Sequence, residues 1–483
     1  MSGSVGMWSQ VSRSRSRVGY HGVMSRTGRF AVALALIALS FVPARGAEPS
    51  PPAPPARPPN VVVFIADDLG WADCSIYGGR DVAMPALERV ARAGLTFTHA
   101  FVNSPSCAPS RAALLTGLEP ARNGAMANHA RPRADVKRWP AYFKELGYET
   151  VAIGKTAHYA QVQQYGFDHV SHFKYHEDDC VGAAVKWLAE RKSEKPLCLI
   201  VGTNWPHVPW PRETGRIDPA KVTLPANTVD TQETRQARAR YLAAVGNMDR
   251  DLGLTYDAAR KHLGENTVFV FTADHGSQFP FGKWNCYDAG VRAPLVVVWP
   301  GKVKAGSTSG AMVMWTDLMP TLLEASGGKA AEGLDGRSFL PVVLGKAEAH
   351  REQVFFTHSA DGQMNRYPMR AMRTREWKYV RNLDPAAEHH THIDLGKPGA
   401  DGREYWDSWV IAAKADAAAA AIVRRYHTRP AEELYDLAAD PDERRNLAGE
   451  AGQAVRLAEM RKLVDEWMKG QGDKGMETGR AQR

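Results

Sequence analysis

The feature that most constrains the fold is the run 60–66, which reads Asn-Val-Val-Val-Phe-Ile-Ala and is apolar at every position after the first. Side chains of a strand alternate between two faces, so a continuous apolar run suits a strand buried on both faces of a parallel sheet. The run ends in two neighbouring carboxylates, Asp67 and Asp68. Adjacent carboxylates repel each other, and at the end of a buried strand they call for a cation. Taken alone, the pair is equally typical of an exposed turn.

Further apolar runs follow along the chain, and segments with helical patterning separate them. Strands are predicted at 149–153, 197–201, 267–272 and 294–299, and helices at 84–93, 139–146, 179–191 and 232–262. Strands that alternate with helices predict an α/β fold with a large, doubly wound, mostly parallel sheet.

Polar side chains follow four of these five strands at the same end. In doubly wound sheets, ligands bind beyond the carboxyl ends of the strands. We therefore expect one edge of the sheet to carry Asp67, Asp68, Lys155, His158, His207, Asp274 and His275. Any one of these residues alone could be an ordinary solvated or loop residue. Four strands that end in this way indicate a functional site.

The segment 106–117 places a thiol, a proline and an arginine directly before a helix-forming run. Cys107 is therefore expected at or near a helix N-terminus, a position that favours negative charge. With Arg111 nearby, Cys107 could be a nucleophile of lowered pKa. The alternative is a buried structural cysteine, which a short pattern by itself favours.

The N-terminus resembles an export signal. Arg26 and Arg29 precede an apolar run, 30–42, and small residues at 44–47 offer a cleavage site. The run is too short for a comfortable membrane span. We expect an exported, periplasmic or secreted protein, with either Met1 or Met24 as its start. In such a protein the odd count of five cysteines leaves at least one unpaired, and up to two disulfides could join Cys74, Cys180, Cys198 and Cys286.

The pattern changes after about residue 345. Short strands are predicted at 353–356, 369–373, 377–381 and 433–437, an Ala-rich helix at 411–422 and a final helix at 453–468. This order predicts a smaller α+β domain with an antiparallel sheet and one covering helix. The predicted parts are a leader and export signal (1–47), a Pro-rich linker (48–58), a catalytic domain (59–345) and the C-terminal domain (346–483). The histidines at 389, 390 and 392 fit a metal site or, more readily, a solvated loop.

The net charge of +8 has the sign expected for an anionic substrate. Lysine and arginine are scattered along the chain, without the spacing of a zinc finger or a basic helix. Nucleic acid is therefore not an expected partner. The oligomeric state, including a homodimer, stays open.

Taken together, the motifs resemble the type I sulfatase family of the alkaline phosphatase superfamily, over nearly all of 58–470. The motifs that carry this resemblance are 60–70, Cys107-Ala108-Pro109-Ser110-Arg111 with 114–117, Gly154-Lys155, Pro206-His207, Asp274-His275-Gly276 and Gly282-Lys283-Trp284. The resemblance implies that a formylglycine-generating enzyme converts Cys107 to formylglycine, whose hydrated aldehyde is the nucleophile. It also implies a calcium ion held by Asp67, Asp68, residue 107, Asp274 and His275.

The resemblance assigns a role to each remaining residue of the motifs. Arg111 and Lys155 hold the diol at residue 107, Lys283 binds the sulfate, His207 protonates the leaving atom and His158 helps to deprotonate the diol as sulfate departs. Two positions differ from many relatives. The histidine follows the lysine by three positions instead of two, and His275 stands where some members have asparagine.

Within the family, the chain is most similar to the heparan N-sulfatases. The signals are 240–253, the run Tyr367-Pro368-Met369-Arg370 followed by 378–383, and 433–436 with Asp440-Pro441 and Asn446-Leu447-Ala448. The implied substrate is N-sulfoglucosamine of heparan-type saccharides, with Asp361, Arg366 and Arg370 as candidate sugar contacts. Trp205 replaces the acidic residue that those enzymes have before the Pro-His pair.

Three alternatives to an N-sulfatase stay open. The first is an O-sulfatase that acts on another sulfated polysaccharide. The second is a phosphonate or phosphodiester hydrolase of the same superfamily, although the extra His and Asp ligands of a two-zinc site are missing near Cys107. The third is an inactive glycan-binding protein, which would be expected to have lost Cys107 or one of the aspartates.

Overall fold

The computed structural model describes residues 57–174, 179–329, 331–400 and 402–476. The predicted export signal and nearly all of the Pro-rich linker lie outside the described residues. Among the residues that the structure describes, no helix has the length and apolarity that a membrane span requires.

The main sheet has eight strands in the order β4-β3-β5-β1-β6-β7-β2-β8. β1 lies between β5 and β6 and pairs with both in parallel, whereas β7 is antiparallel to both of its neighbours. The prediction of a mostly parallel α/β sheet is confirmed. The strand bounds are β1 (Asn60–Ala66), β2 (Leu95–Phe101), β3 (Glu149–Gly154), β4 (His169–Ser171), β5 (Leu197–Gly202), β6 (Thr267–Ala273), β7 (Leu295–Val298) and β8 (Ser307–Met314).

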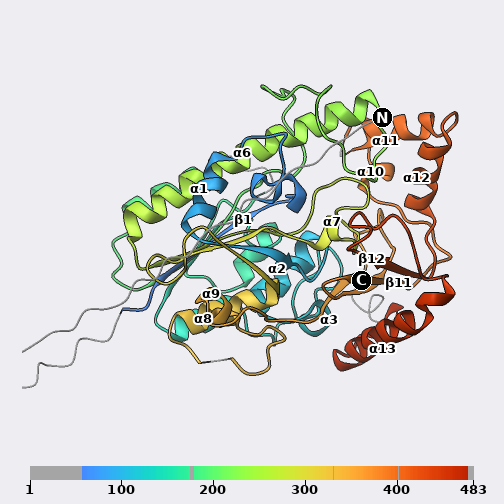
Figure 1. The fold of residues 1–483 in the computed structure, drawn as a ribbon. Coiled ribbons are helices and arrows are strands. Elements are labelled where there is room, and N and C mark those ends of the chain that lie inside the picture. The colour runs from blue at the N-terminus through green and yellow to red at the C-terminus, as the bar shows by residue number, and fades with distance from the viewer. Residues whose placement is uncertain (1–56, 175–178, 330, 401, 477–483) are drawn as a thin grey trace, which may run out of the picture. The chain divides into compact units, whose positions relative to one another are not determined.

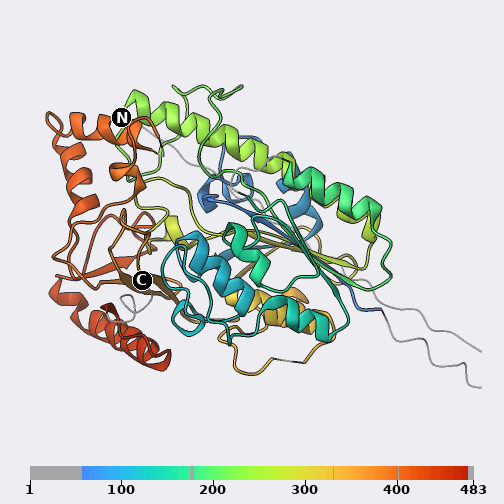
Figure 2. The same cartoon turned by 180° about the vertical axis from the view of Figure 1, so that it is seen from behind.

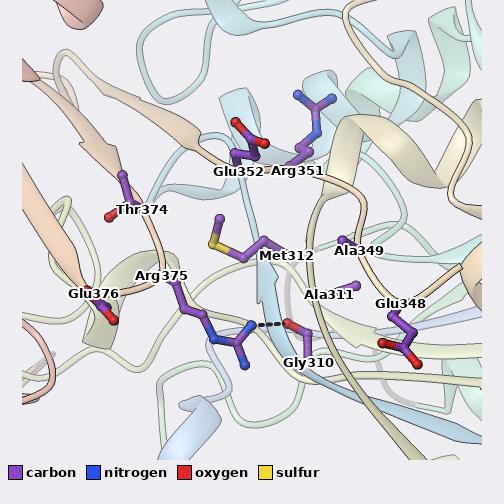
Figure 3. Close-up of a pocket in the computed structure, with 10 residues that line it drawn as sticks. All are labelled: Gly310, Ala311, Met312, Glu348, Ala349, Arg351, Glu352, Thr374, Arg375 and Glu376. Carbon is purple, nitrogen blue, oxygen red and sulfur yellow. Dashed lines mark hydrogen bonds between the residues drawn. The ribbon is translucent and has the colours of Figure 1, made fainter.

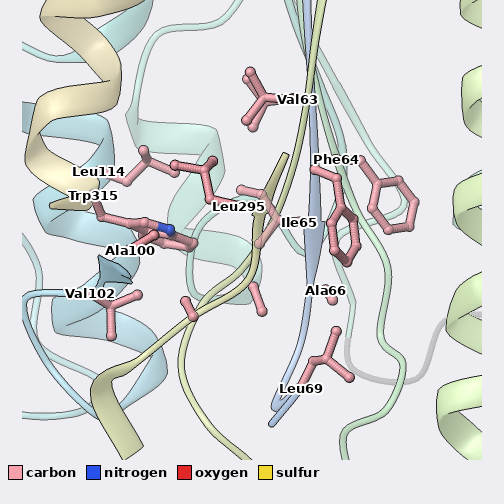
Figure 4. Close-up of a cluster of buried hydrophobic side chains, with 14 of the residues drawn as sticks. Val63, Phe64, Ile65, Ala66, Leu69, Ala100, Val102, Leu114, Leu295 and Trp315 are labelled. Atoms are coloured by element: carbon pink, nitrogen blue, oxygen red, sulfur yellow. The ribbon is translucent and has the colours of Figure 1, made fainter. Parts of the chain in front are cut away.

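β1 packs on both of its faces, as its apolar run predicts. Val63 and Ile65 point to the side that holds Leu114 and Trp315, while Phe64 points to the opposite side (Figure 4). Val63, Phe64 and Ile65 are fully buried. Each such side chain contributes about 1.5–3 kcal/mol to stability. The strand that ends at the two carboxylates is therefore firmly held.

Helices cover both sides of this sheet (Figures 1 and 2). α6 (Gln232–Leu263) lies on one side with α1 (Pro85–Ala93), and α2 (Cys107–Thr116) and α8 (Leu318–Ala325) lie on the other. The other helices here are α3 (Pro120–Asn123), α4 (Trp139–Glu145), α5 (Cys180–Glu190), α7 (Asp288–Val291) and α9 (Leu340–Val343), with short 3-10 helices η1 (Trp71–Asp73), η2 (Ser75–Tyr77), η3 (Tyr159–Gln164) and η4 (Trp315–Asp317).

A second, antiparallel sheet of four strands has the order β12-β11-β10-β9. Its strands are β9 (Val354–His358), β10 (Met369–Arg373), β11 (Trp377–Asn382) and β12 (Glu432–Asp436), and α13 (Ala454–Gly470) packs on β10 and β11 after η5 (Ala451–Gln453). This sheet and α13 agree with the α+β pattern predicted after residue 345. The domain boundary itself stays a prediction.

The Ala-rich segment 411–422, which is predicted to be helical, is helical at both ends but is interrupted between residues 412 and 417. Two helices occupy this region after α10 (His392–Leu395), namely α11 (Arg403–Ala412) and α12 (Ala417–His427). The break has a local cause, because Asp416 caps α12 and its side chain accepts a hydrogen bond from the Ala418 amide. Disulfides are not formed either: all five cysteines are free and buried.

Candidate active site

Three aspartates meet at the carboxyl ends of β1 and β6. These strands pair in register up to Ala66 and Ala273, so the residues that follow them are neighbours. The backbone amide of Asp68 donates to Asp274 Oδ1 at 3.0 Å. Asp68 has a positive φ of 66°, so the chain turns sharply directly after Asp67. The register of two central strands thus builds the acidic cluster.

Three buried cations face these three carboxylates. Arg111 Nε lies 2.9 Å from Asp274, and its Nη2 lies 3.1 Å from Asp67. The Lys155 ammonium lies 2.6 Å from the same Asp67. A matching contact of 2.7 Å joins Lys283 Nζ to Asp68 Oδ2. All six side chains are almost completely buried, so their charges are balanced without water.

The balance sets the pKa of each carboxyl. Burial raises the pKa of Asp274, but Arg111 and His275 outweigh burial and hold it well below its usual range. Burial raises the pKa of Asp67 as well, but the charges of Lys155, His207 and Arg111 together outweigh burial and lower it. For Asp68, burial outweighs Lys283 and the pKa is raised.

Cys107 is the first residue of α2, beside the acidic cluster. Its Sγ lies 3.2 Å from His275 Nε2, 3.8 Å from Lys155 Nζ, and 3.9 and 4.0 Å from carboxylate oxygens of Asp67 and Asp68. Burial raises the pKa of the thiol well above its usual value, despite the nearby lysine. The thiolate is therefore disfavoured, which contradicts the idea of a cysteine nucleophile activated by a lowered pKa.

Ligand atoms for a metal ion converge at this point. One atom each from Asp68, Cys107, Asp274 and His275 lies within 4.8 Å of the others, and all four residues are buried. His275 Nδ1 lies 2.9 Å from the carbonyl oxygen of Gly276, so in the neutral ring it donates there and Nε2 faces the cluster. These are four of the five ligands that the resemblance implies, and the fifth, Asp67, lies beside them with its Oδ1 3.9 Å from Cys107 Sγ.

A cleft of about 150 Å³ opens above the cluster. Its lining contains the predicted residues Cys107, His158, His207, Lys283 and Asp361, together with Asn128, His129, Tyr159, Val208, Gln278, Trp284 and His392. The structure thus brings together segments that lie far apart in the sequence. Tyr159 begins η3 and His392 begins α10, and the other additional lining residues lie on loops. Of these additional residues, only Trp284, in its Gly-Lys-Trp motif, and His392, in the histidine-rich tract, stood out in the sequence.

His207 faces Asp68 across this cleft. Its Nδ1 lies 2.6 Å from the Val208 carbonyl oxygen, and its Nε2 lies 3.8 Å from Asp68 Oδ2. Burial, followed by the charges of Lys283 and Lys155, lowers the pKa of His207 well below its usual value. Without an anion in the cleft, the ring is neutral.

A chain of hydrogen bonds connects Asp361 with His158 through His129. The Asp361 carboxylate lies 3.2 Å from His129 Nε2, and His129 Nδ1 lies 2.8 Å from His158 Nε2. Asn128 Nδ2 and Trp284 Nε1 donate to Asp361 Oδ2 at 2.9 and 2.7 Å. Burial raises the pKa of Asp361, but the hydrogen bond from His129 and the other polar neighbours outweigh burial and hold it well below its usual range. Asp361 is thus an ionised acceptor.

This order of donors assigns the proton on each ring. Because an ionised carboxylate only accepts, a His129 ring that carries one proton donates from Nε2 and accepts at Nδ1 from His158 Nε2–H. His158 Nδ1 is left with its lone pair, and this buried atom has no hydrogen-bond partner among the described residues. Burial, together with Lys155, lowers the pKa of His158 well below its usual value. His158, one of the residues that line the cleft, is therefore a neutral base with a buried, unpaired Nδ1.

The structure places the three candidate sugar contacts in different environments. Asp361 lines the cleft, although its carboxylate is already engaged by three side chains. Arg366 is exposed and does not contribute to the lining. Arg370 is fully buried and pairs through two nitrogens with Asp473, away from the cleft. The structure does not bring Arg370 to the site, because its guanidinium is used within the C-terminal fold.

Another hollow, of about 380 Å³, lies between β8 and the turn after β10. Figure 3 shows its lining, in which Arg375 Nη1 donates to the Gly310 carbonyl oxygen at 2.9 Å. None of the predicted site residues lies there. The chemistry is therefore concentrated in the smaller cleft above Cys107.

Comparisons with known proteins agree with this geometry. A family model described as "Sulfatase" matches residues 59–328, which is more than half of the chain. The chain belongs to the sulfatase family. This sulfatase also matches a model described as "N-sulphoglucosamine sulphohydrolase, C-terminal" over residues 276–407. It is therefore a hydrolase, and its family assignment from the sequence motifs is confirmed.

Similar proteins include two curated sulfatases. An "Ulvan-active sulfatase" of Formosa agariphila is 31% identical over 430 residues, which cover 86% of this chain and 81% of the relative. Human "N-sulphoglucosamine sulphohydrolase" is 29% identical over 471 residues and covers 85% and 90% of the two chains. Among solved structures, a protein in complex with "its substrate D-Glucosamine-2-N, 6-O-disulfate" has a TM-score of 0.67 at 20% identity, with 86% and 99% coverage. The last comparison shows the alkaline phosphatase-like sulfatase fold.

Proposed function

We propose that this sulfatase removes sulfate from glycans through formylglycine at position 107 and a bound calcium ion, with N-sulfoglucosamine of heparan-type saccharides as the leading substrate. The observation that carries the proposal is the convergence of three carboxylates, three cations and a buried Cys107 of raised pKa beside one cleft. The family match and the curated relatives support it.

The residues beside Cys107 fit a hard cation. Asp67, Asp68 and Asp274 supply carboxylate oxygens, which are the ligands that calcium prefers. Conversion of Cys107 would replace the one soft sulfur of the cluster by oxygen. Calcium, when bound, would offset carboxylate charge and polarise a sulfate oxygen. His275 is the weaker ligand of the set, because a ring nitrogen suits calcium less well than oxygen does.

The environment of Cys107 disfavours a thiolate nucleophile. Burial and the neighbouring carboxylates make its thiolate costly. Formylglycine would supply a hydrated aldehyde with two hydroxyl groups, one more than serine or cysteine can offer. Arg111 and Lys155 lie beside residue 107 and would hold its oxygens in place. Their buried ion pairs keep both side chains fixed before substrate arrives.

Three other side chains of the cleft would handle the sulfate and the protons. Lys283 Nζ lies in the lining and would bind a sulfate oxygen. An anion there would favour protonation of His207, which could then give a proton from Nε2 to the leaving atom. His158, with its free Nδ1, would take a proton from residue 107 as sulfate leaves. Asp361 and His129 would fix the tautomer of His158, so we assign Asp361 to positioning instead of sugar contact.

The C-terminal match supports an N-sulfated sugar. It spans Trp284, Asp361 and His392, which together form one wall of the cleft. Trp284 stacks on His392 with centroids 4.9 Å apart and an angle of 11° between the rings. The wall that would face the sugar therefore comes from the segment that resembles N-sulphoglucosamine sulphohydrolase.

An O-sulfatase is the second candidate. The relatives named for ulvan at 31% identity and for N-acetylglucosamine-6-O-sulfate at 24% favour it.

Solved phosphonate monoester hydrolases share the fold at a TM-score of 0.67 or slightly less, but only 18–20% of the sequence. We also propose that the protein is exported, on the basis of its N-terminal sequence.

The test is sulfate release by the purified protein, with mass spectrometry of the peptide that contains residue 107. We expect the aldehyde at this position and a higher kcat/KM on glucosamine N-sulfate than on N-acetylglucosamine 6-sulfate. Cys107→Ala should abolish release from both substrates. Preference for the 6-sulfate would favour the O-sulfatase, and an active preparation with an unmodified thiol would refute the formylglycine mechanism.

A further inference from the structure

A second cluster of metal-ligating side chains, none of which lines the cleft, consists of His390, from the histidine-rich tract, with Asp394 and His427. His390 precedes α10, Asp394 lies in α10, and His427 is the last residue of α12. One ligand atom from each of these residues lies within 4.8 Å of the other two. His390 Nδ1 and Asp394 Oδ2 are 2.6 Å apart. Two imidazoles and one carboxylate are a ligand set that suits zinc and related ions.

Each of the three residues has a partner that orients it toward the others. His427 Nδ1 lies 2.9 Å from the His389 carbonyl oxygen, so in the neutral ring it donates there and Nε2 keeps the lone pair. His390 Nε2 lies 3.4 Å from Glu388 Oε2, which can accept its proton while Nδ1 binds an ion. Pairing a ligating histidine with a carboxylate or a carbonyl is the usual support for a zinc ligand.

Asp394 is oriented in the same way. Its Oδ1 accepts hydrogen bonds from the Thr391 amide at 2.7 Å and from the Tyr426 hydroxyl at 2.9 Å. The other oxygen, Oδ2, is the one that faces His390. The backbone is fixed as well, because the His389 amide donates to the His427 carbonyl oxygen at 2.8 Å. The cluster therefore has its supporting contacts before any ion binds.

We propose that His390, Asp394 and His427 form a binding site for a divalent transition metal, with Zn²⁺ as the best-suited ion. His390 and His427 are half-buried, so an ion can reach them from solvent. The ion would join the segment before α10 to the end of α12. His392, two residues from His390, stacks on Trp284 in the cleft, so the ion would also stiffen that wall. None of its three ligands lines the cleft above Cys107.

The test is a titration of full-length, untagged protein with Zn²⁺ and, separately, Co²⁺, in excess Ca²⁺. A Cys107→Ala background removes the thiol of the other cluster. We expect one equivalent of Zn²⁺ by calorimetry, a Co²⁺ spectrum without a thiolate band, and a higher Tm with Zn²⁺. His427→Gln and His390→Gln should each weaken binding at least tenfold, and Glu388→Gln should weaken it by about tenfold, as the loss of an orienting partner does.

His262→Gln is the matched control, because this exposed histidine at the end of α6 belongs to no such cluster. It should bind Zn²⁺ as the parent does. Circular dichroism checks that each variant is folded, and two independent histidine variants guard against the failure of one. Zn²⁺ binding that persists in both variants, or a parent protein that binds none, would overturn the proposal.

Discussion

Asp361→Asn should slow turnover by reversing the proton order between Asp361, His129 and His158. The amide oxygen can take the place of Oδ2 and keep the hydrogen bonds from Asn128 and Trp284. Its NH₂ group then faces His129 Nε2, which must accept. His129 Nδ1 becomes the donor, His158 Nε2 becomes the acceptor, and the proton of His158 moves to Nδ1. The free base in the cleft is lost without any change in size.

The expected magnitude follows from the contacts. In the variant, the productive tautomer, which leaves His158 Nδ1 unprotonated, needs a proton on His129 Nε2. The amide N–H of the introduced asparagine would then face this N–H, and one hydrogen bond would be lost. Turning the amide around would instead leave Asn128 and Trp284 donating to an NH₂ group. An unsatisfied buried donor costs about 1–3 kcal/mol, and about 1.4 kcal/mol corresponds to a factor of ten. The productive population, and kcat with it, should therefore fall by about 5- to 150-fold.

The assay is steady-state sulfate release from an aryl sulfate ester, with nitrogen NMR of histidine-labelled protein to report the tautomer of His158. Trp284→Phe is the matched comparison, because it removes one hydrogen bond to the same carboxylate but leaves the order at His129 intact. It should lose less activity than Asp361→Asn and keep the parent tautomer. A kcat for Asp361→Asn within twofold of the parent, or an unchanged tautomer, would refute the reasoning.

Three other perturbations test separate parts of the structure. Arg370→Ala should lower the free energy of unfolding by about 3–5 kcal/mol in denaturant titrations, because it leaves Asp473 buried and unpaired. The kcat/KM of the folded variant should stay within twofold of the parent. A large loss of kcat/KM without a loss of stability would instead show that Arg370 belongs to the site. Burial, together with Asp335, raises the pKa of Glu119 from 4.5 to about 8. Between these two pH values the folded chain holds a proton that the unfolded chain releases. Glu119 therefore makes the free energy of unfolding fall as the pH rises from 4.5 to 8. Glu119→Gln lacks that slope, and its stability relative to the parent should increase with pH by at most about 1.4 kcal/mol per unit; parallel pH profiles would contradict the raised pKa. Removal of calcium with a chelator should abolish sulfate release and should lower Tm, with recovery of both on adding calcium, and full activity in the chelator would exclude a required ion.

Long apolar runs made most of the main sheet predictable. β1, β3, β5 and β6 begin and end within one or two residues of the runs that mark them, since burial on both faces leaves no polar position to obscure the pattern. β2, β8 and the three-residue β4 were not predicted. β2 contains two threonines and a histidine, and β8 begins with Ser-Thr-Ser-Gly and lies at the edge of the sheet, so neither shows a continuous run.

The site was predictable where its residues follow strands, and much less so elsewhere. Asp67 and Asp274 directly follow β1 and β6, whose continuous apolar runs mark both strands in the sequence, and the parallel pairing of these strands brings the two residues together. His129 and Asn128 lie on a loop, and His129 has a positive φ of 68° that no local pattern indicates. For Arg370 the sequence predicted a site residue that the structure does not place in the site. An arginine in a strand can contact a sugar or a buried carboxylate, and the local sequence is the same in both cases. Only the position of Asp473, far along the chain, decides between them.

The balanced charges around Cys107 have a consequence for the order in which ligands bind. Three carboxylates and three cations cancel, so the unliganded centre offers a sulfate ester little net attraction. A divalent cation would leave the centre positive, and an anion bound there would in turn hold the cation more tightly. Linkage makes these two effects equal in free energy. The protein should therefore bind calcium more tightly when sulfate is present. Its affinity for each ion depends on whether the other ion is bound.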